Sequence, residues 1–531
     1  MKINKIHIEN FKSLKDATVS FPDKIAIVVG DNEVGKTTLL EAINLGLTAQ
    51  LNGRHIGYEL HPYLFNSISS SEYLSSLLEG TNPMPPRILV ELYFAEHDEL
   101  GSLKGSINST GEDCPGVSLT IEFDPKFEDE YANYIANPAD VTSIPIEYMK
   151  VVWRTFADQD ITARSLPVRC SLIDATTVRH DLGANRYLTE VMANYLEPHD
   201  LARLGLSYRK MKDLFLGDPS ITAINTELEK AKGTVSDKTI SIGLDNTARA
   251  KWEAGVIPHL DDIPFSLVGK GEQTSTKIKL ALEKAEGSRV ILVEEPENHQ
   301  SHTNLSALLE SMFGKAGENQ IIVSTHSSFV LNKLGLDGTV LFDGEAGATL
   351  MDLPEDTKNY FLKLSGHDTL RLILSKRAIL VEGPSDELLV QRAYKDVHGV
   401  LPLADGTEII SVRSLAFKRF LDIARLLNID IRVITDNDGD VAKLKKKYGD
   451  YLGADGVLIS FDDDEGAPTL EPQLVKYNGR NLTNKILGKD FATDEQLVEY
   501  MEGHKTDCAL KFFESETAMV IPDYIQHAIA K

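Results

Sequence analysis

The order of apolar and polar positions predicts strands and helices from the first residues onward. Residues 3–8 and 19–21 carry spaced apolar side chains that predict two short strands. Residues 25–29 (IAIVV) form a continuous apolar run, which is typical of a strand buried on both faces of a sheet. This run leads through a Gly-rich turn into an apolar helix, which we predict at 38–47. The N-terminal region therefore begins as a sheet that contains a strand–turn–helix unit.

The next part of the chain has a weaker pattern. Residues 50–145 are rich in Ser, Pro, Gly and Asn, so we predict loops and hairpins there, with strands at 88–94 and 117–123. From 186 to 232 apolar positions recur at helical spacing, and strand character returns near 257–268.

Two later segments alternate strands with helices, as parallel α/β sheets do. In the first segment we predict helices at 275–284 and 303–313 and strands at 290–293 and 320–324. In the second segment, which begins near Ser375, we predict strands at 378–381, 408–411 and 431–435, with helices at 386–395 and 416–427 between them. The boundary between the two folds falls around 360–376.

Residues 30–37 (GDNEVGKT) fit the phosphate-binding pattern G-x-x-x-x-G-K-[ST] between the buried strand and the apolar helix. The glycines let backbone N–H groups turn toward phosphate oxygens, and Lys36 neutralises the β- and γ-phosphates. The Thr37 hydroxyl can take a Mg²⁺ position, and the helix dipole adds to the attraction. A chance match is the alternative, but the strand and helix around this segment are those that the motif requires. The predicted nucleotide-binding residues here are Gly30, Asn32, Gly35, Lys36, Thr37 and Thr38.

Two further segments carry groups suited to nucleotide hydrolysis. Glu294 and Glu295 follow the predicted strand 290–293. We expect Glu294 to hold Mg²⁺ through water and Glu295 to polarise the attacking water. Adjacent glutamates are usually a solvated pair, but their position at a strand end favours the functional interpretation. His326 follows the strand 320–324 and can hydrogen-bond a γ-phosphate.

A second Gly-rich segment, 269–273 (GKGEQ), leads into the predicted helix 275–284. With the phosphate-binding pattern, the glutamates and His326, it resembles the ABC ATPase class, in particular its DNA-repair and SMC-like branch. The N-terminal segment 6–12 (IHIENFK) shares this resemblance. In that class the Gly-rich segment is the signature motif, which binds the γ-phosphate of a nucleotide held by a second copy. The resemblance therefore implies a homodimer with ATP at its seam, contacted by Gly269, Gly271 and Gln273.

Acidic residues follow two strands of the second α/β segment. Carboxylates at the carboxyl edge of neighbouring parallel strands provide hard oxygen ligands suited to Mg²⁺ or Mn²⁺. Two such ions would stabilise the attacking and the leaving oxygen of a phosphodiester. The candidate ligands are Glu382, Asp386, Asp436, Asp438 and Asp440.

Two alternative interpretations of these aspartates remain open. The aspartates could form a Ca²⁺-binding loop, but Lys447 stands where an EF-hand has its Glu. They could also form a solvated turn. The downstream acidic run 462–465 is interpreted as a solvated loop.

The E-G-x-x-D pattern at 382–386 and the D-x-D-x-D pattern at 436–440 look like a Toprim domain. An ABC-type half followed by Toprim resembles the overcoming-lysogenisation-defect (OLD) family of nucleases over nearly the whole chain. The resemblance implies that Glu471 completes a metal site and that Lys505 stabilises the pentavalent transition state. One departure concerns residues 294–302 (EEPENHQSH), where the family often reads E-E-P-E-x-H-L-H-P, so a role for His302 is in doubt.

The resemblance also implies a fold class and a domain order. We expect an α/β protein in which an ABC-type ATPase domain with an inserted helical dimerisation element precedes a Toprim α/β domain. The ATPase domain is predicted at 1–183 and 236–370, the insert at 184–235 and the Toprim domain at 371–531.

Composition changes this picture little. A chain of 531 residues is too long for one core, and 42% hydrophobic with 25% charged residues is typical of a soluble protein. The net charge of -25 argues against a protein that coats nucleic acid, but it permits a local contact with DNA. No run approaches the roughly 18 apolar residues of a membrane helix, and we see no signal peptide, so we expect a cytoplasmic protein without a membrane partner. The three scattered cysteines are expected to be reduced thiols.

These observations predict an ATPase that is also a metal-dependent DNA endonuclease, whose cofactors are ATP with one Mg²⁺ and two Mg²⁺ or Mn²⁺ ions in the Toprim site. The expected partners are DNA and further copies of the chain, as a homodimer or a higher homo-oligomer. The resemblance implies antiphage defence, as in Gabija-like and retron-linked systems, with room for a second defence component. The predicted catalytic residues are Glu295, His326, Glu382 and Lys505.

Two alternatives remain open from the sequence. One is an SMC- or RecF-like DNA-repair ATPase that clamps DNA without cutting it. The other is a topoisomerase- or primase-like enzyme; a topoisomerase would need a tyrosine nucleophile such as Tyr448 or Tyr451. The sequence leaves open whether the substrate is DNA or RNA and whether ATP activates or restrains cleavage.

Overall fold

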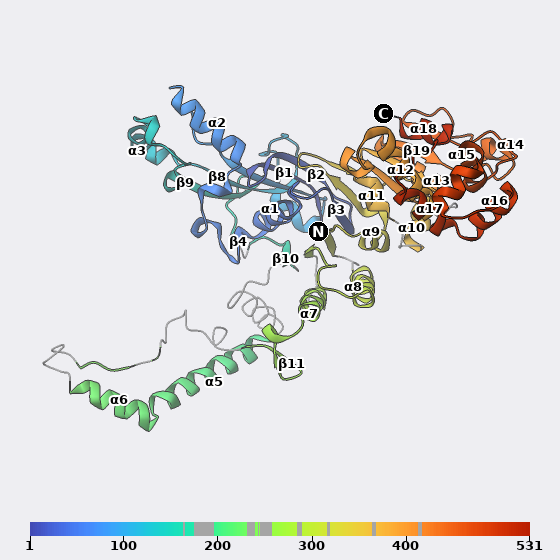
Figure 1. The fold of residues 1–531 in the computed structure, drawn as a ribbon. Coiled ribbons are helices and arrows are strands. Elements are labelled where there is room, and N and C mark those ends of the chain that lie inside the picture. Colours follow the sequence, from blue (N-terminus) through green and yellow to red (C-terminus); the bar gives the residue numbers. More distant parts are fainter. Residues whose placement is uncertain are drawn as a thin grey trace. The chain divides into compact units, whose positions relative to one another are not determined.

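The structure is a computed structural model that describes residues 1–162, 165–174, 196–230, 239–242, 244, 257–283, 289–315, 319–363, 368–412 and 417–530 (Figure 1). The chain divides into two compact units, and each is described by itself. The larger unit comprises Lys2–Pro167 and Ile322–Lys531, and the smaller unit comprises Val168–Ile321 with Met1. None of the described helices is long and apolar enough to cross a membrane.

The larger unit begins with an antiparallel sheet. Its strands are β1 (Ile3–Phe11), β2 (Leu14–Ser20), β6 (Ile88–Phe94), β7 (Lys104–Gly105), β8 (Cys114–Phe123) and β9 (Met149–Thr155). Their order is β2-β1-β6-β8-β7, and β9 pairs with β8. Leu14, Ala17 and Val19 of β2 are buried and its other residues are exposed, whereas β6 is buried at every position. The predicted strands of this region are therefore present.

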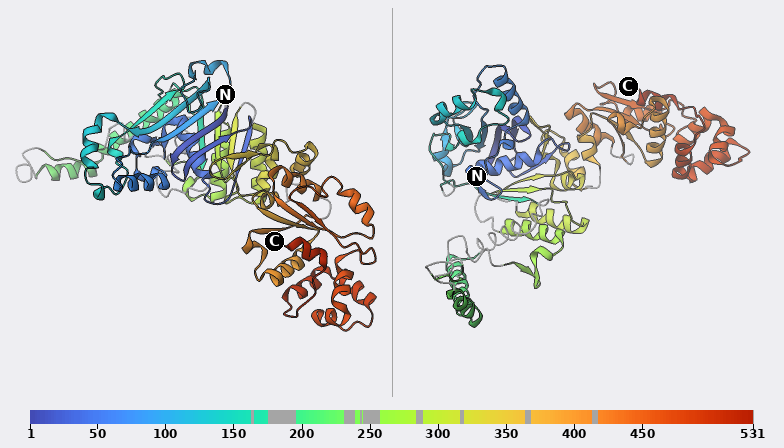
Figure 2. Two further views of the ribbon diagram at one scale, coloured as in Figure 1. Left: turned by 90° about the horizontal axis from the view of Figure 1, so that it is seen from above. Right: turned by 60° about the vertical axis from the view of Figure 1, so that its left-hand side comes forward.

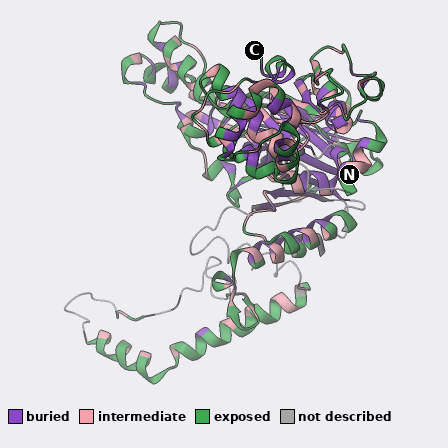
Figure 3. Cartoon of the chain, turned by 45° about the vertical axis from the view of Figure 1, so that its right-hand side comes forward, coloured by how far each residue is buried: buried purple, intermediate pink, exposed green. Residues whose placement is uncertain are grey.

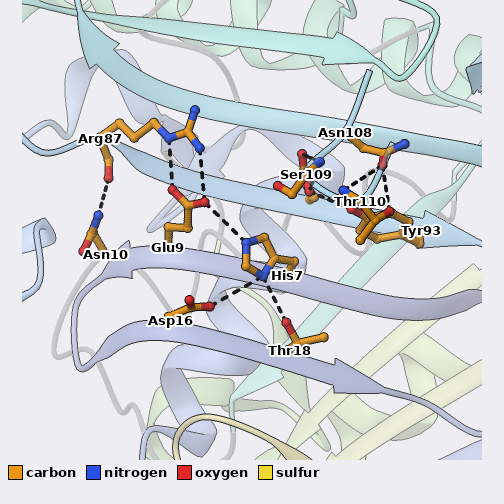
Figure 4. Close-up of polar contacts among 11 residues, drawn as sticks. His7, Glu9, Asn10, Asp16, Thr18, Arg87, Tyr93, Asn108, Ser109 and Thr110 are labelled. Atoms are coloured by element: carbon orange, nitrogen blue, oxygen red, sulfur yellow. Dashed lines mark hydrogen bonds and ion pairs between the residues drawn. The ribbon is translucent and has the colours of Figure 1, made fainter. Parts of the chain in front are cut away.

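A polar network lies on this sheet (Figure 4). Arg87 donates to both carboxylate oxygens of Glu9 at 3.0 and 3.1 Å, and His7 Nε2 lies 3.4 Å from Glu9 Oε1. His7 Nδ1 lies 3.0 Å from the Thr18 hydroxyl. The hydrogen bond from His7, together with Arg87, lowers the pKa of Glu9 to about 2, and the same bond raises the pKa of His7. The charge of Glu9 is thus balanced within the sheet.

A strand–turn–helix unit follows the first hairpin, as predicted. The strand β3 (Ile25–Val29) is fully buried and leads to the helix α1 (Lys36–Thr48). β3 pairs in parallel with β15 (Thr339–Phe342), which pairs in antiparallel with β16 (Gly347–Thr349).

Three short helices, α9 (Ser328–Leu334), α10 (Glu355–Lys363) and α11 (Thr369–Ile373), lead from this part of the larger unit to its second sheet. The Thr369 hydroxyl lies 2.7 Å from Asn332 Oδ1, which joins α11 to α9. Arg371 pairs with Glu408 at 2.6 Å, which joins α11 to the second sheet.

The second sheet is parallel throughout (Figure 2). Its strands are β17 (Arg377–Val381), β18 (Thr407–Ser411), β19 (Asp430–Ile434) and β20 (Val457–Ser460), in the order β18-β17-β19-β20. The accompanying helices are α12 (Pro384–His398), α13 (Phe417–Leu427), α14 (Val441–Lys447), α15 (Leu470–Leu487), α16 (Asp494–Gly503), α17 (Lys505–Glu514) and α18 (Asp523–Ile529). Side chains of β17, α12, α15, α17 and α18 share one apolar core that includes Val381, Leu389, Leu474, Phe512 and Ile525.

The smaller unit contains the parallel pair β10 (Arg169–Asp174) and β13 (Arg289–Glu294) with the helices α7 (Lys270–Glu283) and α8 (His302–Lys315). The helices α5 (Pro198–Leu216) and α6 (Pro219–Glu229) are largely exposed (Figure 3). The boundary between the two units falls within β14 (Gln320–Ser324).

Two expectations about secondary structure are corrected by the structure. The Ser-rich region predicted as loops and hairpins contains the helix α2 (Ser67–Leu78), which Asn66 caps by accepting from the N–H of Ile68 and of Ser69. Tyr73 and Leu77 form its buried face at a spacing of four residues, and the surrounding serines masked this pattern.

The predicted strand near 257–268 is the second correction. It is reduced to the two-residue strands β11 (His259–Leu260) and β12 (Ile263–Pro264) around a turn of two left-handed aspartates. Of the predicted helical insert, residues 184–195 and 231–235 lie outside the described residues. The three cysteines, Cys114, Cys170 and Cys508, are free thiols.

Candidate functional sites

Residues 30–37, which we call the phosphate loop, have a backbone that only glycine permits at two positions. Gly35 has φ 99°, and a Cβ there would lie 2.7 Å from Leu14 Cδ2. A Cβ on Gly30 would lie 2.3 Å from the backbone oxygen of Phe342 in β15. Glu33 also has a positive φ, so the loop alternates in handedness as anion-binding backbone nests do.

The side chains of the phosphate loop are arranged around its lysine. Lys36 Nζ donates to the backbone oxygens of Gly30 and Asp31 at 2.9 and 2.7 Å, which holds its ammonium group over the loop. Asn32 and Thr37 are exposed, so both are accessible to a ligand. Thr38 is buried, and its hydroxyl lies 3.1 Å from the Ser13 hydroxyl. Thr38 therefore packs α1 against the first hairpin, and its contact with the nucleotide stays a prediction.

His326 is exposed directly after β14. The preceding residue, Thr325, donates its N–H to the backbone oxygen of Val28 in β3 at 3.2 Å. Because β3 continues into the phosphate loop two residues later, the structure places the end of β14 beside the entrance to that loop. The predicted γ-phosphate contact of His326 fits this position.

The remaining predicted ATPase residues lie in the smaller unit. Glu294 ends β13 and is buried, and Glu295 has φ 43° and accepts from Asn298 Nδ2 at 2.6 Å. Gln300 Nε2 donates to the backbone oxygen of Gly271 at 2.6 Å. This bond ties the segment after the glutamates to the start of α7.

The Gly-rich segment 269–273 forms the first turn of α7 rather than a separate loop. A Cβ on Gly271 would lie 2.3 Å from the backbone oxygen of His299, so this position requires glycine for close packing. The buried Gln273 donates to the backbone oxygen of Val268 at 2.7 Å, and Gly269 is exposed. Within the smaller unit, the structure therefore holds the candidate signature motif and the candidate hydrolytic glutamates together.

The acidic residues of the second sheet meet at the carboxyl ends of β17 and β19. Glu382 Oε1 accepts from the Thr435 hydroxyl at 2.6 Å and from the backbone N–H of Asp436 at 3.1 Å. Asp386 Oδ2 accepts from the backbone N–H of Gly383 at 2.9 Å, in the first turn of α12. The two acidic motifs, which lie far apart in the sequence, are thus neighbours in the fold.

The pKa values of Asp436 and Asp386 indicate which acids lie close together at the carboxyl ends of β17 and β19. Burial, together with the charges of Asp386, Glu382 and Glu471, raises the pKa of Asp436 to about 8. Burial and the charges of Glu382 and Glu471 raise the pKa of Asp386 to about 6. We call Glu382, Asp386, Asp436 and Glu471 the acidic cluster.

Lys505 lies at the edge of the acidic cluster. Its ammonium group lies 3.3 Å from Glu471 Oε2, and Glu471 is buried at the start of α15. Burial lowers the pKa of Lys505, but the charges of Glu471 and Asp436 outweigh it and raise that pKa. The structure therefore brings together both residues that only the family resemblance implied.

Asp438 and Asp440 lie outside the acidic cluster on the exposed part of the loop after β19. Asp440 caps α14 by accepting from the backbone N–H of Lys443 at 2.9 Å. Asp438 has φ 50°. The buried Asn437 holds the loop by donating to the backbone oxygens of Asp462 and Asp464. No acidic pattern in the sequence marks Asn437, because its side chain is an amide.

The acidic run 462–465 is held mainly by local contacts. Asp464 pairs with Lys476 at 2.8 Å, Asp463 pairs with Lys445 at 3.2 Å, and Glu465 accepts from the backbone N–H of Val441. These contacts agree with its interpretation as a loop rather than a set of metal ligands.

The acidic cluster has the chemistry of a divalent-cation site. Four buried or partly buried carboxylates repel one another, and a cation among them would relieve that repulsion. In the sequence, Glu471 lies between Thr469 and Gln473, whose side-chain oxygens are buried without a hydrogen-bond partner. Among the residues that the structure describes, no three His, Cys, Asp or Glu side chains are already arranged as a metal-binding group. The reason is that Glu382 and Asp386 are turned toward N–H and hydroxyl groups of the protein.

Three tyrosines in the last third of the chain, Tyr448, Tyr451 and Tyr524, are all buried. Tyr448 is fully buried, and the Tyr451 hydroxyl donates to Asp422 at 2.7 Å. Neither is therefore placed as an exposed nucleophile. Tyr524 of α18 is buried, and burial with the charges of Asp436 and Asp386 raises its pKa well above the usual value. No sequence pattern marked Tyr524.

Parts of the chain match three known families. Residues 1–130 match the AAA ATPase domain family, and residues 158–332 match the family described as AAA domain, putative AbiEii toxin, Type IV TA system. Residues 373–438 match the Overcoming lysogenization defect protein-like TOPRIM domain. These matches confirm the resemblance drawn from the sequence. This chain is an α/β protein in which AAA-type ATPase domains precede an OLD-like Toprim domain.

Individual relatives are similar to the chain over different lengths. Endonuclease GajA of Bacillus cereus is 22% identical over 487 residues, which is 86% of this chain and 78% of the relative. The DNA replication and repair protein RecF of Bacillus cytotoxicus is 42% identical over 43 residues, which is 8% of this chain and 12% of that protein. The C-terminal region of the Burkholderia pseudomallei OLD protein is 18% identical, with a TM-score of 0.23, over 29% of this chain and 96% of that structure. A superposition with so low a score carries no argument of its own.

Proposed function

We propose that this protein is an ATP-regulated, divalent-metal-dependent DNA endonuclease that serves antiphage defence. The observation that carries the proposal is the acidic cluster, in which Asp436 donates its N–H to Glu382 and both lie beside Asp386, Glu471 and Lys505. The similarity to endonuclease GajA supports the same activity. We retain the division into an ATPase domain at 1–183 and 236–370, an insert at 184–235 and a Toprim domain at 371–531 as part of this proposal.

The residues of the acidic cluster have separate roles in the proposed reaction. Two Mg²⁺ or Mn²⁺ ions, when bound, would supply an activated water and stabilise the leaving oxygen of the phosphodiester. Glu382, Asp386, Asp436 and Glu471 would hold these ions, with Asp438 as an outer ligand. Lys505 would place its positive charge on the phosphate as negative charge develops in the transition state. Asp440 would act mainly by fixing the loop, because its carboxylate caps α14.

The ATPase part would regulate cleavage rather than perform it. The phosphate loop would bind ATP with one Mg²⁺ at Thr37, and Glu294 would complete the Mg²⁺ site. Glu295 would polarise the water that attacks the γ-phosphate, and His326 would contact that phosphate. The first turn of α7, with Gly269, Gly271 and Gln273, would contact the nucleotide of a second copy. ATP would therefore hold two copies of the chain together as a homodimer.

The helices α5 and α6 provide apolar surface for such a dimer. Leu206 and Leu214 of α5 and Ile224 of α6 are 55%, 76% and 44% exposed, which is costly for an isolated chain. We propose that a second copy covers this surface. The mass in solution tests this proposal: we expect a dimer or higher homo-oligomer, and a monomeric parent protein at all concentrations would contradict it.

The nuclease proposal is tested with supercoiled plasmid incubated with Mg²⁺ or Mn²⁺. We expect the parent protein to nick or linearise the plasmid and Asp436→Asn to lose this activity, because the amide removes a charged ligand from the acidic cluster. Asp455→Asn is the matched control, since Asp455 is exposed where the chain enters β20, at the opposite edge of the sheet. Cleavage by Asp436→Asn at the parent rate would show that the metal assignment is wrong.

One observation favours a second candidate, an ATPase that clamps DNA without cutting it. Three of the four cluster carboxylates are occupied with protein groups, and no three of the described acidic, His or Cys side chains form a ready metal site. This candidate predicts that plasmid stays intact under every metal while the protein still binds DNA.

A further inference from the structure

Three lysines share one face of α14, the helix that follows the acidic loop 436–440. Lys443, Lys446 and Lys447 are spaced by three and four residues, which places them on the same side of a helix. All three are exposed, whereas Leu444, on an adjacent side of the helix, is buried. The helix therefore shows a continuous positive surface to solvent.

These lysines are not neutralised by neighbouring acids. Within the described residues, no carboxylate lies within 4.0 Å of the ammonium group of Lys443, Lys446 or Lys447. Lys445, on a different side of the helix, is the contrasting case, since it pairs with Asp463 at 3.2 Å. Unpaired lysines are notable in a chain with a net charge of -25, where acids outnumber bases by 80 to 55.

The structure fixes this helix firmly to the acidic site. Asp440 caps its first turn, and Glu465 accepts from the backbone N–H of Val441 at 3.1 Å. Asn437 holds the preceding loop through two side-chain hydrogen bonds. Only six residues separate Asp440 from Lys446, and the seven-residue helix is about 10 Å long, so the lysines stay close to the loop that leaves the acidic cluster.

We propose that the lysine face of α14, formed by Lys443, Lys446 and Lys447, binds the phosphate backbone of duplex DNA beside the scissile bond. This inference rests on the proposed nuclease function, and it adds the surface that holds the substrate. The acidic cluster repels DNA when it carries no cation, so a nearby basic surface is needed to bring the backbone to it. Lys443 and Lys447 lie about 6 Å apart along the helix axis, close to the two steps of about 3.4 Å between the first and third of three successive phosphates on one strand.

The expected partner of the lysine face is a polyanion with regularly spaced phosphates rather than a protein. Lysine ammonium groups contact phosphates as point charges and read no sequence, so this surface would bind duplexes of any sequence. Each neutralised phosphate releases counterions, and the binding constant then falls with salt by a slope of about 0.9 per contact. The lysine face should therefore contribute about 2–3 to the salt slope of DNA binding.

The experiment measures binding of a fluorescent duplex of about 30 base pairs over a salt series, with each protein carrying Asp436→Asn to prevent cleavage. The test variant combines Lys443→Ala, Lys446→Ala and Lys447→Ala. The matched control combines Lys395→Ala, Lys485→Ala and Lys489→Ala. These control lysines are equally exposed, and they lie at or just beyond the far ends of α12 and α15, helices that begin at the acidic cluster.

We expect the test variant to bind duplex DNA roughly 10- to 100-fold more weakly than the parent at about 0.1 M salt, with the salt slope reduced by about 2–3. The control variant should keep the parent affinity and slope. Reversing the three charges with Glu in place of Ala should weaken binding further, and melting curves should show that all variants fold. These substitutions lie on the surface, so we expect melting temperatures close to that of the parent.

Several results would overturn the proposal. Unchanged affinity and slope in the test variant would show that α14 does not hold DNA, even where the parent protein cleaves plasmid. An equal loss in the control variant would show a general charge effect instead of a specific surface. Tighter binding of duplex RNA than of duplex DNA would contradict the assignment of DNA as the partner. If the parent protein cleaves no plasmid under any metal, the nuclease proposal fails separately, whatever the binding series shows.

Discussion

The phosphate loop and the acidic cluster both lie at the carboxyl ends of parallel strands of the larger unit, but they are built differently. The phosphate loop is one continuous segment, and its backbone is set by Gly30 and Gly35. Its only basic side chain, Lys36, is already held by two backbone oxygens. The acidic cluster combines three distant segments, and burial together with neighbouring carboxylates raises the pKa values of Asp436 and Asp386.

This difference separates a preformed anion site from a site that a cation must complete. The phosphate loop needs no change in net charge to receive phosphate, because its donors belong to the backbone. The acidic cluster carries like charges, and Glu382 and Asp386 turn toward N–H and hydroxyl groups of the protein. We infer that divalent cations would turn these carboxylates inward. The comparison therefore predicts that the two sites respond to different substitutions.

The largest expected effect concerns the lysine of the phosphate loop. Lys36→Ala should lower the rate of ATP hydrolysis on the order of 100-fold or more, because it removes the charge that stabilises the β- and γ-phosphates. The rate of ATP hydrolysis measures this effect, and Lys24→Ala is the control, since Lys24 is an exposed lysine just before β3. Plasmid cleavage without nucleotide should persist in Lys36→Ala. If a folded Lys36→Ala protein lost that cleavage as well, the two sites would not be chemically separate.

A smaller effect concerns the backbone of the phosphate loop. Gly30→Ala should lower the free energy of unfolding by about 2 kcal/mol, because the new Cβ would lie 2.3 Å from the backbone oxygen of Phe342. Gly101→Ala, where nothing lies within 4 Å of the new Cβ, should change it by less than about 0.5 kcal/mol. Denaturant unfolding of both variants provides the measurement. Equal stabilities would show that the loop is not rigidly built.

The smallest effect concerns Glu9, an acid that is paired with basic side chains, in contrast to the carboxylates of the acidic cluster, which repel one another. Glu9→Gln should lower the free energy of unfolding by about 1 kcal/mol near neutral pH, because Glu9 binds Arg87 and His7. The pKa of Glu9 is lowered from 4.5 to about 2 in the folded chain, so its stabilising effect is present above about pH 4.5 and disappears as the pH falls toward 2.

The partner histidine adds an upper limit to this pH range. The pKa of His7 is raised above 6.5 in the folded chain, so its contribution is full below that pH and is lost as the pH rises through the folded value. The difference between parent and Glu9→Gln should therefore be largest between about pH 4.5 and 6.5. Unfolding curves across this range test it, and a difference that does not vary with pH would contradict the assignment.

The same contrast explains what the sequence could predict. The phosphate loop, β3 and α1 are contiguous, so their periodicity and glycines were sufficient to locate them. The strands β17 to β19 were predicted for the same reason, and the acids at their ends followed from strand order. Glu471 and Lys505 could be named only through the family resemblance, because no local pattern shows that α15 and α17 meet the sheet.

Other features depend on packing that no local pattern shows. Tyr524 is placed near the acidic cluster by the fold of the last helix, and Asn437 acts through bonds to a loop more than twenty residues away. The helix α2 escaped prediction because its serines mask two buried positions. Thr38 was predicted as a nucleotide contact, but its burial and its contact with Ser13 depend on how the first hairpin packs.

The central claim is that carboxylates from separate segments bind divalent ions together. Crystals of the full chain soaked with Mn²⁺ in the absence of nucleotide, with the anomalous signal recorded at the manganese edge, test it most directly. The account predicts anomalous peaks ligated by Glu382 and Asp436, with Asp386 and Glu471 turned inward, and loss of these peaks in Asp436→Asn. Manganese bound elsewhere on the chain, with no peak among these four carboxylates, would contradict it.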